Sequence, residues 1–389
     1  MIAIIYFSLM FFLFYIYLGY PLFLVLISFF TKKKIQVDNN YCPIVTLIIA
    51  AYNEEKVIEE KIKNSLKIDY PPDKFEIIIF SDASNDRTDE IVNQYRNKGI
   101  KLVRYEGRNG KTFCQNETVK LAEGEIIVFS DANSMYEENA VKQIVKYFID
   151  SKVGCVVGEL KYEGVEDFRT EENVPGEGVY WLYEQKLKKM ENMISSVVTA
   201  NGSIYAVRKD YYIPLVKEAS SDFAEPLKLF QKGYRILYEP ESIAWEKTAP
   251  NYREEFQRRV RIVSRTFSTF IRDRQLVSII NPFRFGLFSI QFFSHKLLRW
   301  LSGLFLLLLI FFNLLLYNYG IFYQFTFWGQ IVFYIMAMVG WLTEYMRKEW
   351  NFKVTHVAFY FCLSCWAMLV GIFNSLNGNH FITWEVKRS

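Results

Sequence analysis

The chain has 389 residues, which at about 150 residues per domain would make two to three units, but about a third of it is strongly apolar. Lys and Arg number 46 and Asp and Glu 42, a formal net charge of +4. So small an excess, with the basic residues scattered along the chain, does not predict a nucleic-acid partner. The apolar stretches exclude an ordinary cytosolic enzyme.

Four apolar stretches are each long enough to cross about 30 Å of hydrocarbon as a helix, and membrane lipids are therefore expected partners. Basic residues follow the first stretch at 32–34 and lie between the last two as Arg347, Lys348 and Lys353. Because they follow the first stretch, it is expected to stay as an anchor rather than be cleaved. The positive-inside rule places both clusters, and the domain between the spans, in the cytoplasm. The four stretches lie at about 2–30, 297–317, 320–342 and 354–376.

The segment 283–299 is apolar but is interrupted by Arg284, His295, Lys296 and Arg299. This pattern favours an amphipathic helix in the membrane interface, although a longer tilted span with snorkelling ends fits equally well. The predicted organisation is an anchor at 1–31, a cytoplasmic domain at 32–282, the interfacial helix at 283–299, and a membrane domain with three spans at 300–389.

Within the central domain, strands and helices are expected to alternate. The run IVTLIIAA at 44–51 is continuously apolar, as in a strand buried on both faces of a parallel sheet. The alternation that follows predicts an α/β fold with a mostly parallel sheet. Further strands are predicted at 75–80, 101–105 and 125–130, and helices at 54–65, 88–95 and 111–122.

Polar residues follow three of these strands, at the sheet edge where α/β proteins bind ligands. Asp131 and Asn133 are two residues apart, so in extended chain both side chains can face one hard cation. An Asx turn is the alternative explanation of this pair. All three histidines lie in or near the apolar segments, at His295, His356 and His380. A histidine-based triad or zinc site in the central domain is therefore excluded, and carboxylates remain as acid–base and metal-binding groups.

Four segments, in this order, resemble the family 2 glycosyltransferases, in particular the membrane-bound branch with the poly-N-acetylglucosamine, hyaluronan and cellulose synthases. The resemblance runs from about residue 44 to 266 and continues more loosely through the spans. It implies a nucleotide-diphospho-sugar transferase fold of the GT-A type. The segments are IVTLIIAAYNEE, SDASNDRTDEIV, VFSDANSMYEENAV and SSDFAEPLKLFQKGYRILYEPES.

The resemblance also implies roles for individual residues. Asp131 and Asn133 would bind Mg²⁺ or Mn²⁺, Asp222 would be the general base, and Lys111 would lie near the diphosphate of the donor. Other positions would surround the nucleotide or line the acceptor side. The nucleotide-side positions are Ala50, Tyr52, Glu54 and Asp82, and the acceptor-side positions are Gly158, Glu159, Asn201 and Gly202.

For Asp222 a structural role remains open, because Ser221-Asp222 before Phe223 also fits a helix N-cap. The processive synthases carry a Q-x-x-R-W signature, for which this chain has Arg258-Arg259-Val260-Arg261-Ile262. Arg261 keeps the arginine, suited to a departing diphosphate. The tryptophan that would support an acceptor sugar is missing, which favours addition of one or a few sugars.

The expected activity is inverting, metal-dependent transfer from a nucleotide diphosphate sugar, expected to be a UDP-sugar, to a lipid-linked or growing glycan acceptor in surface polysaccharide synthesis. A processive polysaccharide synthase is one alternative. A non-catalytic membrane scaffold with a degenerate transferase domain is the other, because Asn133 and the altered arginine segment depart from the family pattern.

Overall fold

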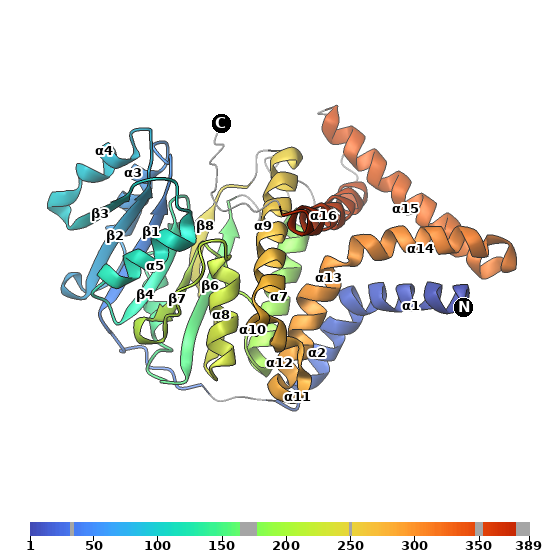
Figure 1. Cartoon of the computed structure of the whole chain (residues 1–389), viewed down its shortest axis with the longest axis horizontal. Helices are drawn as coiled ribbons and strands as arrows, with labels where there is room; N and C mark the ends of the chain where they lie inside the picture. The colour runs from blue at the N-terminus through green and yellow to red at the C-terminus, as the bar shows by residue number, and fades with distance from the viewer. Residues whose placement is uncertain (32–34, 164–176, 249–250, 347–352, 379–389) are drawn as a thin grey trace.

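The computed structural model describes residues 1–31, 35–163, 177–248, 251–346 and 353–378. Two of the features used to orient the chain, the lysines at 32–34 and the basic pair at 347–348, lie outside the described residues. The described chain forms an α/β domain joined to a group of long helices (Figure 1).

The domain is built on one eight-stranded sheet with the order β3-β2-β1-β4-β7-β6-β8-β5. The first four strands are parallel, β7 is antiparallel to both of its neighbours, β8 is parallel to β6, and β5 is antiparallel to β8. The predicted mostly parallel α/β sheet is confirmed. The strands are β1 (Val45–Ala51), β2 (Phe75–Asp82), β3 (Ile100–Tyr105), β4 (Ile126–Asp131), β5 (Met135–Tyr136), β6 (Val153–Tyr162), β7 (Tyr205–Arg208) and β8 (Arg235–Glu246).

The central strands bring their carboxyl ends to one edge of the sheet. Every residue of β1 is buried, as its uninterrupted apolar sequence predicts. In the register of the sheet, Ala50 of β1 pairs with Asp131 of β4, and Ala51 pairs with Ser81 of β2. The loops that follow these three strands therefore lie side by side.

Helices cover both faces of the sheet, and two separate apolar cores fill the spaces beneath them. The helix predicted from residue 54 begins only at Ile58. The prediction is wrong at this end because the Glu54 amide donates to Thr88 Oγ1 at 2.8 Å, which holds residues 52–55 in a loop. The helices of the domain are α3 (Ile58–Ser65), α4 (Thr88–Asn93), α5 (Lys111–Leu121), α6 (Ala140–Val145), α7 (Glu177–Ile194), α8 (Ser221–Gln231), α9 (Tyr252–Arg272) and α10 (Arg274–Val277).

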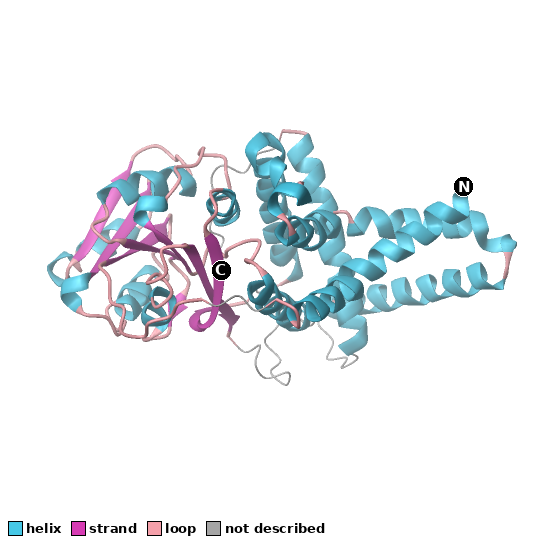
Figure 2. Ribbon diagram, turned by 90° about the horizontal axis from the view of Figure 1, so that it is seen from below, coloured by secondary structure: helices cyan, strands magenta, loops and turns pink. Residues whose placement is uncertain are grey.

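Among the described residues, four helices are long and apolar enough to cross a membrane, one near the N-terminus and three near the C-terminus, as predicted. The first is continuous through a π-helical turn, η1 (Tyr15–Gly19). Figure 2 shows long helices extending from the α/β domain to one side. The four comprise α1 (Ile2–Phe14) with α2 (Tyr20–Ser28), α14 (Ser302–Leu316), α15 (Ile321–Tyr345) and α16 (Lys353–Leu376).

The segment before α14 is a broken helix rather than a single amphipathic one. It contains α11 (Pro282–Phe285), α12 (Leu287–Phe292), a π-helical turn η6 (Phe293–Leu297) and α13 (Leu298–Trp300). Its Phe292 and Trp300 share an apolar cluster with residues of α8, α9 and α16. The α/β domain and the long apolar helices therefore have a common core.

Candidate active site

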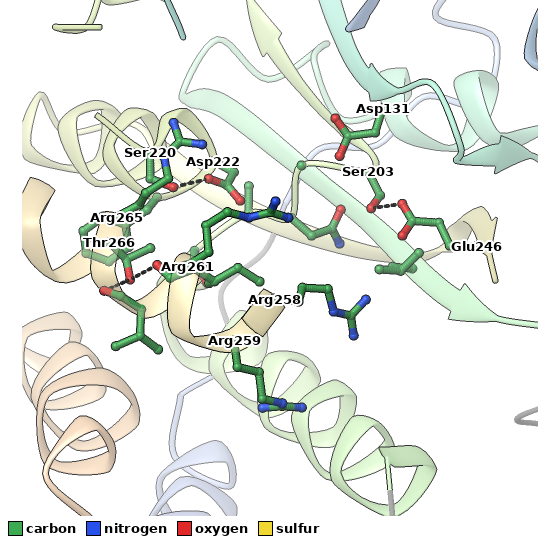
Figure 3. A pocket seen from close by; sticks show the side chains of 18 of the residues that line it. Asp131, Ser203, Ser220, Asp222, Glu246, Arg258, Arg259, Arg261, Arg265 and Thr266 are labelled. Carbon is green, nitrogen blue, oxygen red and sulfur yellow. Dashed lines mark hydrogen bonds between the residues drawn. The ribbon is translucent and has the colours of Figure 1, made fainter. Parts of the chain in front are cut away.

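A cavity of about 1280 Å³ lies at the carboxyl edge of the sheet, between the loops there and the helices α7, α8, α9 and η6. Most of the residues predicted to act on a ligand line it. Figure 3 shows Asp222, Arg261 and Arg265 grouped on one side, with Asp131 opposite. The predicted residues in its wall are Ala50, Glu54, Lys111, Asp131, Asn133, Asn201, Gly202, Asp222 and Arg261.

The loops after β1 and β2 are joined and locally strained. Asn53 and Ala83 both have positive φ, at 52° and 59°, which non-glycine residues rarely adopt. The Asn53 amide donates to Ser84 Oγ at 3.1 Å, and Asn53 Oδ1 accepts from the Asn85 amide at 2.9 Å. Such conformations persist where surrounding contacts hold them and occur often at functional sites.

Tyr52 and Asp82 lie next to the cavity wall and both contact Arg108, which lines it. The Arg108 guanidinium lies over the Tyr52 ring, 3.1 Å from its centroid, and donates to Asp82 Oδ2 at 3.0 Å. Asp82 is fully buried and also accepts from the amides of Asn109 and Gly110 at 2.8 and 3.0 Å. In this structure its carboxylate holds the loop before α5, and direct contact with a nucleotide stays a prediction.

Three predicted functional groups converge on Gly202. A methyl group added there would lie 3.1 Å from Lys111 Nζ, 3.3 Å from Asp131 Oδ2 and 3.8 Å from Asp222 Oδ2. Lys111 also forms an ion pair with Asp131. The three charged side chains come from α5, the end of β4 and α8, so the tertiary fold brings them together.

Asp222 is not the helix N-cap. Helix α8 begins at Ser221, its N-cap is Ser220, and Asp222 is in the first turn. Its Oδ1 accepts a hydrogen bond from Ser220 Oγ at 2.7 Å, and its side chain faces the cavity (Figure 3). The capping alternative is therefore wrong, because the carboxylate is directed to the cavity rather than to the helix amides.

A buried polar network supports the turn that carries Asp131 and Asn133. Lys61 of α3 donates to the Ser134 carbonyl, and its ammonium lies 3.9 Å from the centroid of the Tyr136 ring. Glu246 Oε1 accepts from Ser134 Oγ and, at 2.6 Å, from Ser203 Oγ. Burial lowers the pKa of Lys61 to about 7, and the Asp131 and Glu246 carboxylates oppose this shift. The network ties the loop of Gly202 to the predicted metal-binding turn, which sequence reasoning did not show.

The arginines of α9 form two groups, one paired with a glutamate of the same helix and one next to the predicted catalytic residues. Arg258 and Arg259 pair with the buried Glu255, at 2.6 Å in each case. Arg265, one helical turn after Arg261, donates to the Ala219 carbonyl at 3.1 Å. Burial lowers the pKa of Arg265, while the Asp222 and Asp131 carboxylates raise it. Sequence reasoning missed Arg265, although its i+4 spacing from Arg261 is a signal that it lies on the same helix face.

Two of the four residues predicted on the acceptor side lie behind the wall. The Gly158 carbonyl accepts from Asn201 Nδ2 at 3.1 Å, and a side chain at Gly158 would collide with the Ser242 carbonyl and Ile204. Glu159 is buried, and burial raises its pKa to about 7, with Lys188 the strongest opposing charge. Asn201 and Gly202 line the cavity, so Gly158 positions Asn201 from behind.

His295 is part of the cavity wall, which its place in the sequence did not suggest. Its ring nitrogens contact Glu191 Oε1 at 2.7 Å and Glu184 Oε2 at 3.0 Å. Glu184 also pairs with Arg299, and Glu191 accepts from Tyr20 at 2.6 Å. These contacts join α2 and α7 to the segment before α14.

The family model for Glycosyl transferase family 2 matches residues 46–212, so this part of the chain is a family 2 glycosyltransferase domain. The chain is 25% identical over 364 residues to the probable glycosyltransferase YdaM of Bacillus subtilis, covering 84% of this chain and 81% of that one. It is also 25% identical over 275 residues to the poly-beta-1,6-N-acetyl-D-glucosamine synthase of Staphylococcus aureus. That match covers 68% of this chain and just under two thirds, 64%, of the relative.

Among solved structures, the mannosyltransferase PcManGT from Pyrobaculum calidifontis, in complex with GDP-Man and Mn2+, has a TM-score of 0.69 at 20% identity. The match covers 97% of this chain and 99% of that one, and shows the same fold. The predicted family, the GT-A fold and the glycosyltransferase class of enzyme are confirmed. These matches favour an enzyme over a non-catalytic scaffold.

Proposed function

We propose that this protein transfers a sugar, with inversion, from a nucleotide diphosphate sugar to a hydroxyl of a lipid-linked or growing glycan acceptor. The observation that carries the proposal is the convergence of Lys111, Asp131 and Asp222 around the bare backbone of Gly202. A base, a cation and a second carboxylate within one cavity are the groups that such a transfer requires.

In this mechanism the acceptor oxygen attacks the anomeric carbon of the donor, and its proton passes to the Asp222 carboxylate. The bond between the anomeric carbon and the diphosphate oxygen breaks, and its electron pair leaves with the nucleotide diphosphate. Lys111, Arg261 and Arg265 stabilise the negative charge on that leaving group, since all three belong to the same cavity. Ser220 orients Asp222 through its 2.7 Å hydrogen bond.

For the donor we infer a UDP-sugar, held by the residues at the ends of β1, β2 and β4. One relative is a poly-beta-1,6-N-acetyl-D-glucosamine synthase, and the mannosyltransferase of similar fold is in complex with GDP-Man, a nucleotide diphosphate sugar. Ala50, Glu54 and Arg108 line the cavity near the strand ends, where the nucleotide of an α/β enzyme is expected.

The residues present fit a site for a divalent metal ion, Mg²⁺ or Mn²⁺, whose remaining ligands would come from the donor. Among the described residues no group of three or more His, Cys, Asp or Glu side chains could hold a metal ion alone. Asp131 and Asn133 provide oxygen ligands in the cavity wall, and Mg²⁺ commonly takes few protein ligands plus substrate phosphates. When bound, the ion would neutralise charge on the diphosphate.

We further propose that the catalytic domain is cytoplasmic and that its acceptor arrives from the membrane. The positive-inside rule supports this orientation. The apolar cluster shared by α8, α9, α13 and α16 supports delivery from the membrane, because it holds the cavity next to helices that can cross a bilayer.

A panel of nucleotide sugars tests the proposal. Purified full-length protein is incubated with each donor, with Mg²⁺, Mn²⁺ or a chelator, and nucleotide release is measured. We expect release with one donor or a small group of donors, and Asp131→Ala should abolish metal-dependent nucleotide binding in calorimetry. Absence of both nucleotide binding and donor turnover would refute the proposal, and retained metal dependence in Asp131→Ala would place the metal elsewhere.

A further inference from the structure

The end of the cavity next to the membrane helices has two lysines that form no ion pair with the described residues. Lys188 of α7 and Lys296 of η6 both line the cavity. Lys188 is only 9% exposed, and its ammonium lies 5.7 and 5.8 Å from the ring centroids of Trp181 and Tyr238. Within the described part of the chain, neither ammonium forms a hydrogen bond or an ion pair.

Two of the acidic side chains near the lysines contact other residues. Glu191 accepts from Tyr20 and contacts His295, and Glu184 contacts His295 and pairs with Arg299. Glu159 is buried and close enough to Lys188 to interact electrostatically, but within the described residues no ion pair joins any of these carboxylates to Lys188 or Lys296. Both lysines line the cavity, so an anionic ligand there would pair with them directly.

The two lysines lie close to one another and to Asp222. Burial, and then the neighbouring Lys296, lower the pKa of Lys188 to about 8, while Glu159, Glu191 and Asp222 oppose the shift. Burial also lowers the pKa of Lys296, and Glu191 and Asp222 oppose it. By contrast, burial lowers the pKa of Arg265, and both Asp222 and Asp131 oppose that shift. Both lysines thus share the cavity wall with Asp222, and they come from α7 and η6 rather than from the strand ends where the donor is expected.

The position of the lysines links this end of the cavity to the membrane. Lys296 lies in the helical segment that leads through α13 directly into α14, the first of the C-terminal spans. Lys188 is on α7, which packs on α2 of the N-terminal span through Tyr20, Leu24, Leu187 and Ile194. An anion held by both lysines would lie at the end of the cavity formed by α7, which packs on α2, and by η6, which leads into α14.

We propose that Lys188 and Lys296 bind the phosphate or diphosphate of a lipid-linked acceptor, with the acceptor sugar toward Asp222 and the lipid toward α2 and α14. This inference deepens the proposed function and rests on it. Lysine ammonium groups serve as point charges for phosphate. A neutral glycan acceptor would leave both ammonium groups without an ion pair, so the two lysines favour an acceptor with an anionic linkage.

Binding of farnesyl diphosphate by the full-length protein tests the site without knowledge of the sugar. Farnesol, dioleoyl phosphatidate and inorganic phosphate are the comparison ligands. We expect farnesyl diphosphate to bind at least tenfold more tightly than farnesol or inorganic phosphate. Lys188→Gln and Lys296→Gln should each weaken its binding about tenfold or more, while Lys296→Arg restores most of it. Lys186→Gln, an exposed lysine on the same helix, is the matched control and should bind like wild type.

Equal binding of farnesol and farnesyl diphosphate by the wild type would overturn the inference, whatever the stability of the variants. So would wild-type affinity in both glutamine variants. Tighter binding of phosphatidate would assign the site to a membrane lipid headgroup, and equal binding of inorganic phosphate would assign it to a free anion; both reject an acceptor site. Nucleotide binding and donor turnover are measured on the same preparations. Their absence alongside intact farnesyl diphosphate binding would refute the proposed transferase activity but leave the anion site standing.

Discussion

Asp222 has the surroundings of a base rather than of a structural carboxylate. One oxygen accepts from Ser220, the other lies near the Gly202 backbone, and Arg265 is close enough to interact with it electrostatically. The second oxygen therefore lies beside the charged groups of the cavity, where a base for the acceptor hydroxyl is needed.

Asp222→Asn should keep nucleotide binding and lower transfer by about 10² or more, the usual contribution of a general base. The amide has nearly the same shape and still accepts from Ser220, but it cannot take a proton. Initial rates of nucleotide release and calorimetric nucleotide affinity measure the two effects. Wild-type turnover in the variant would show that Asp222 is not the base.

Glu159 should make the free energy of unfolding depend on pH. Burial raises its pKa to about 7, so the protonated form is favoured in the folded protein. Its contribution to stability is fully present below the ordinary pKa of 4.5 and is lost as pH rises through about 7. Glu159→Gln, which is always neutral, should therefore gain stability over wild type as pH rises from 5 to 8, by on the order of 1 kcal/mol or more.

Thermal unfolding of both proteins at pH 5.5 and pH 8 measures this difference. Glu241→Gln, a change at an exposed carboxylate, is the control and should show no such trend. An equal offset between Glu159→Gln and wild type at both pH values would mean that Glu159 stays ionised in the folded state.

Among the helices, α9 connects the candidate active site to the helices that can cross a membrane. Its cavity face carries Arg261 and Arg265, and its other side packs on α16 so closely that Gly371 has no room for a side chain. A methyl group there would lie 2.8 Å from Val263 Cβ and 3.0 Å from the Val260 carbonyl. A displacement of α16 would therefore move the arginines of the site.

Gly371→Leu should lower transfer by tenfold or more, although residue 371 does not line the cavity, because the added side chain pushes α9 away from Asp222. Gly329→Leu on α15 adds the same side chain where nothing lies within 4 Å and is the matched control. Transfer rates and thermal unfolding are compared for both variants. Full activity in Gly371→Leu would show that α9 does not depend on this packing.

For the whole molecule, the arrangement of the helices defines an orientation that can be tested. The domain follows the first span and precedes the second, so both of its ends must face the same side of a membrane. A cysteine introduced at residue 33 or in the loop 347–353 should resist an impermeant thiol reagent in intact cells and react after permeabilisation. Labelling of either position in intact cells would reverse the proposed orientation.

The whole molecule also determines how many sugars are added to one acceptor before it is released. Ile262 stands where processive synthases have a stacking tryptophan, and its side chain is half exposed. The four spans are mostly apolar and little buried against one another. We expect addition of one or a few sugars per encounter, so products sized at low donor turnover should be short. Long polymer made by the purified protein would contradict this and support a processive synthase.

The sequence alone determined the sheet from β1 to β4, the four spans and the position of the Asp131-x-Asn133 turn, because these depend on local periodicity and on strand ends. Only the tertiary structure placed Arg265 beside Asp222, His295 in the cavity wall, and Lys61 beneath the predicted metal turn. These residues are brought together by contacts between segments far apart in the chain, which no local pattern encodes. The same holds for Lys188 and Lys296, which lie far apart in the sequence and which only the fold brings into one cavity wall.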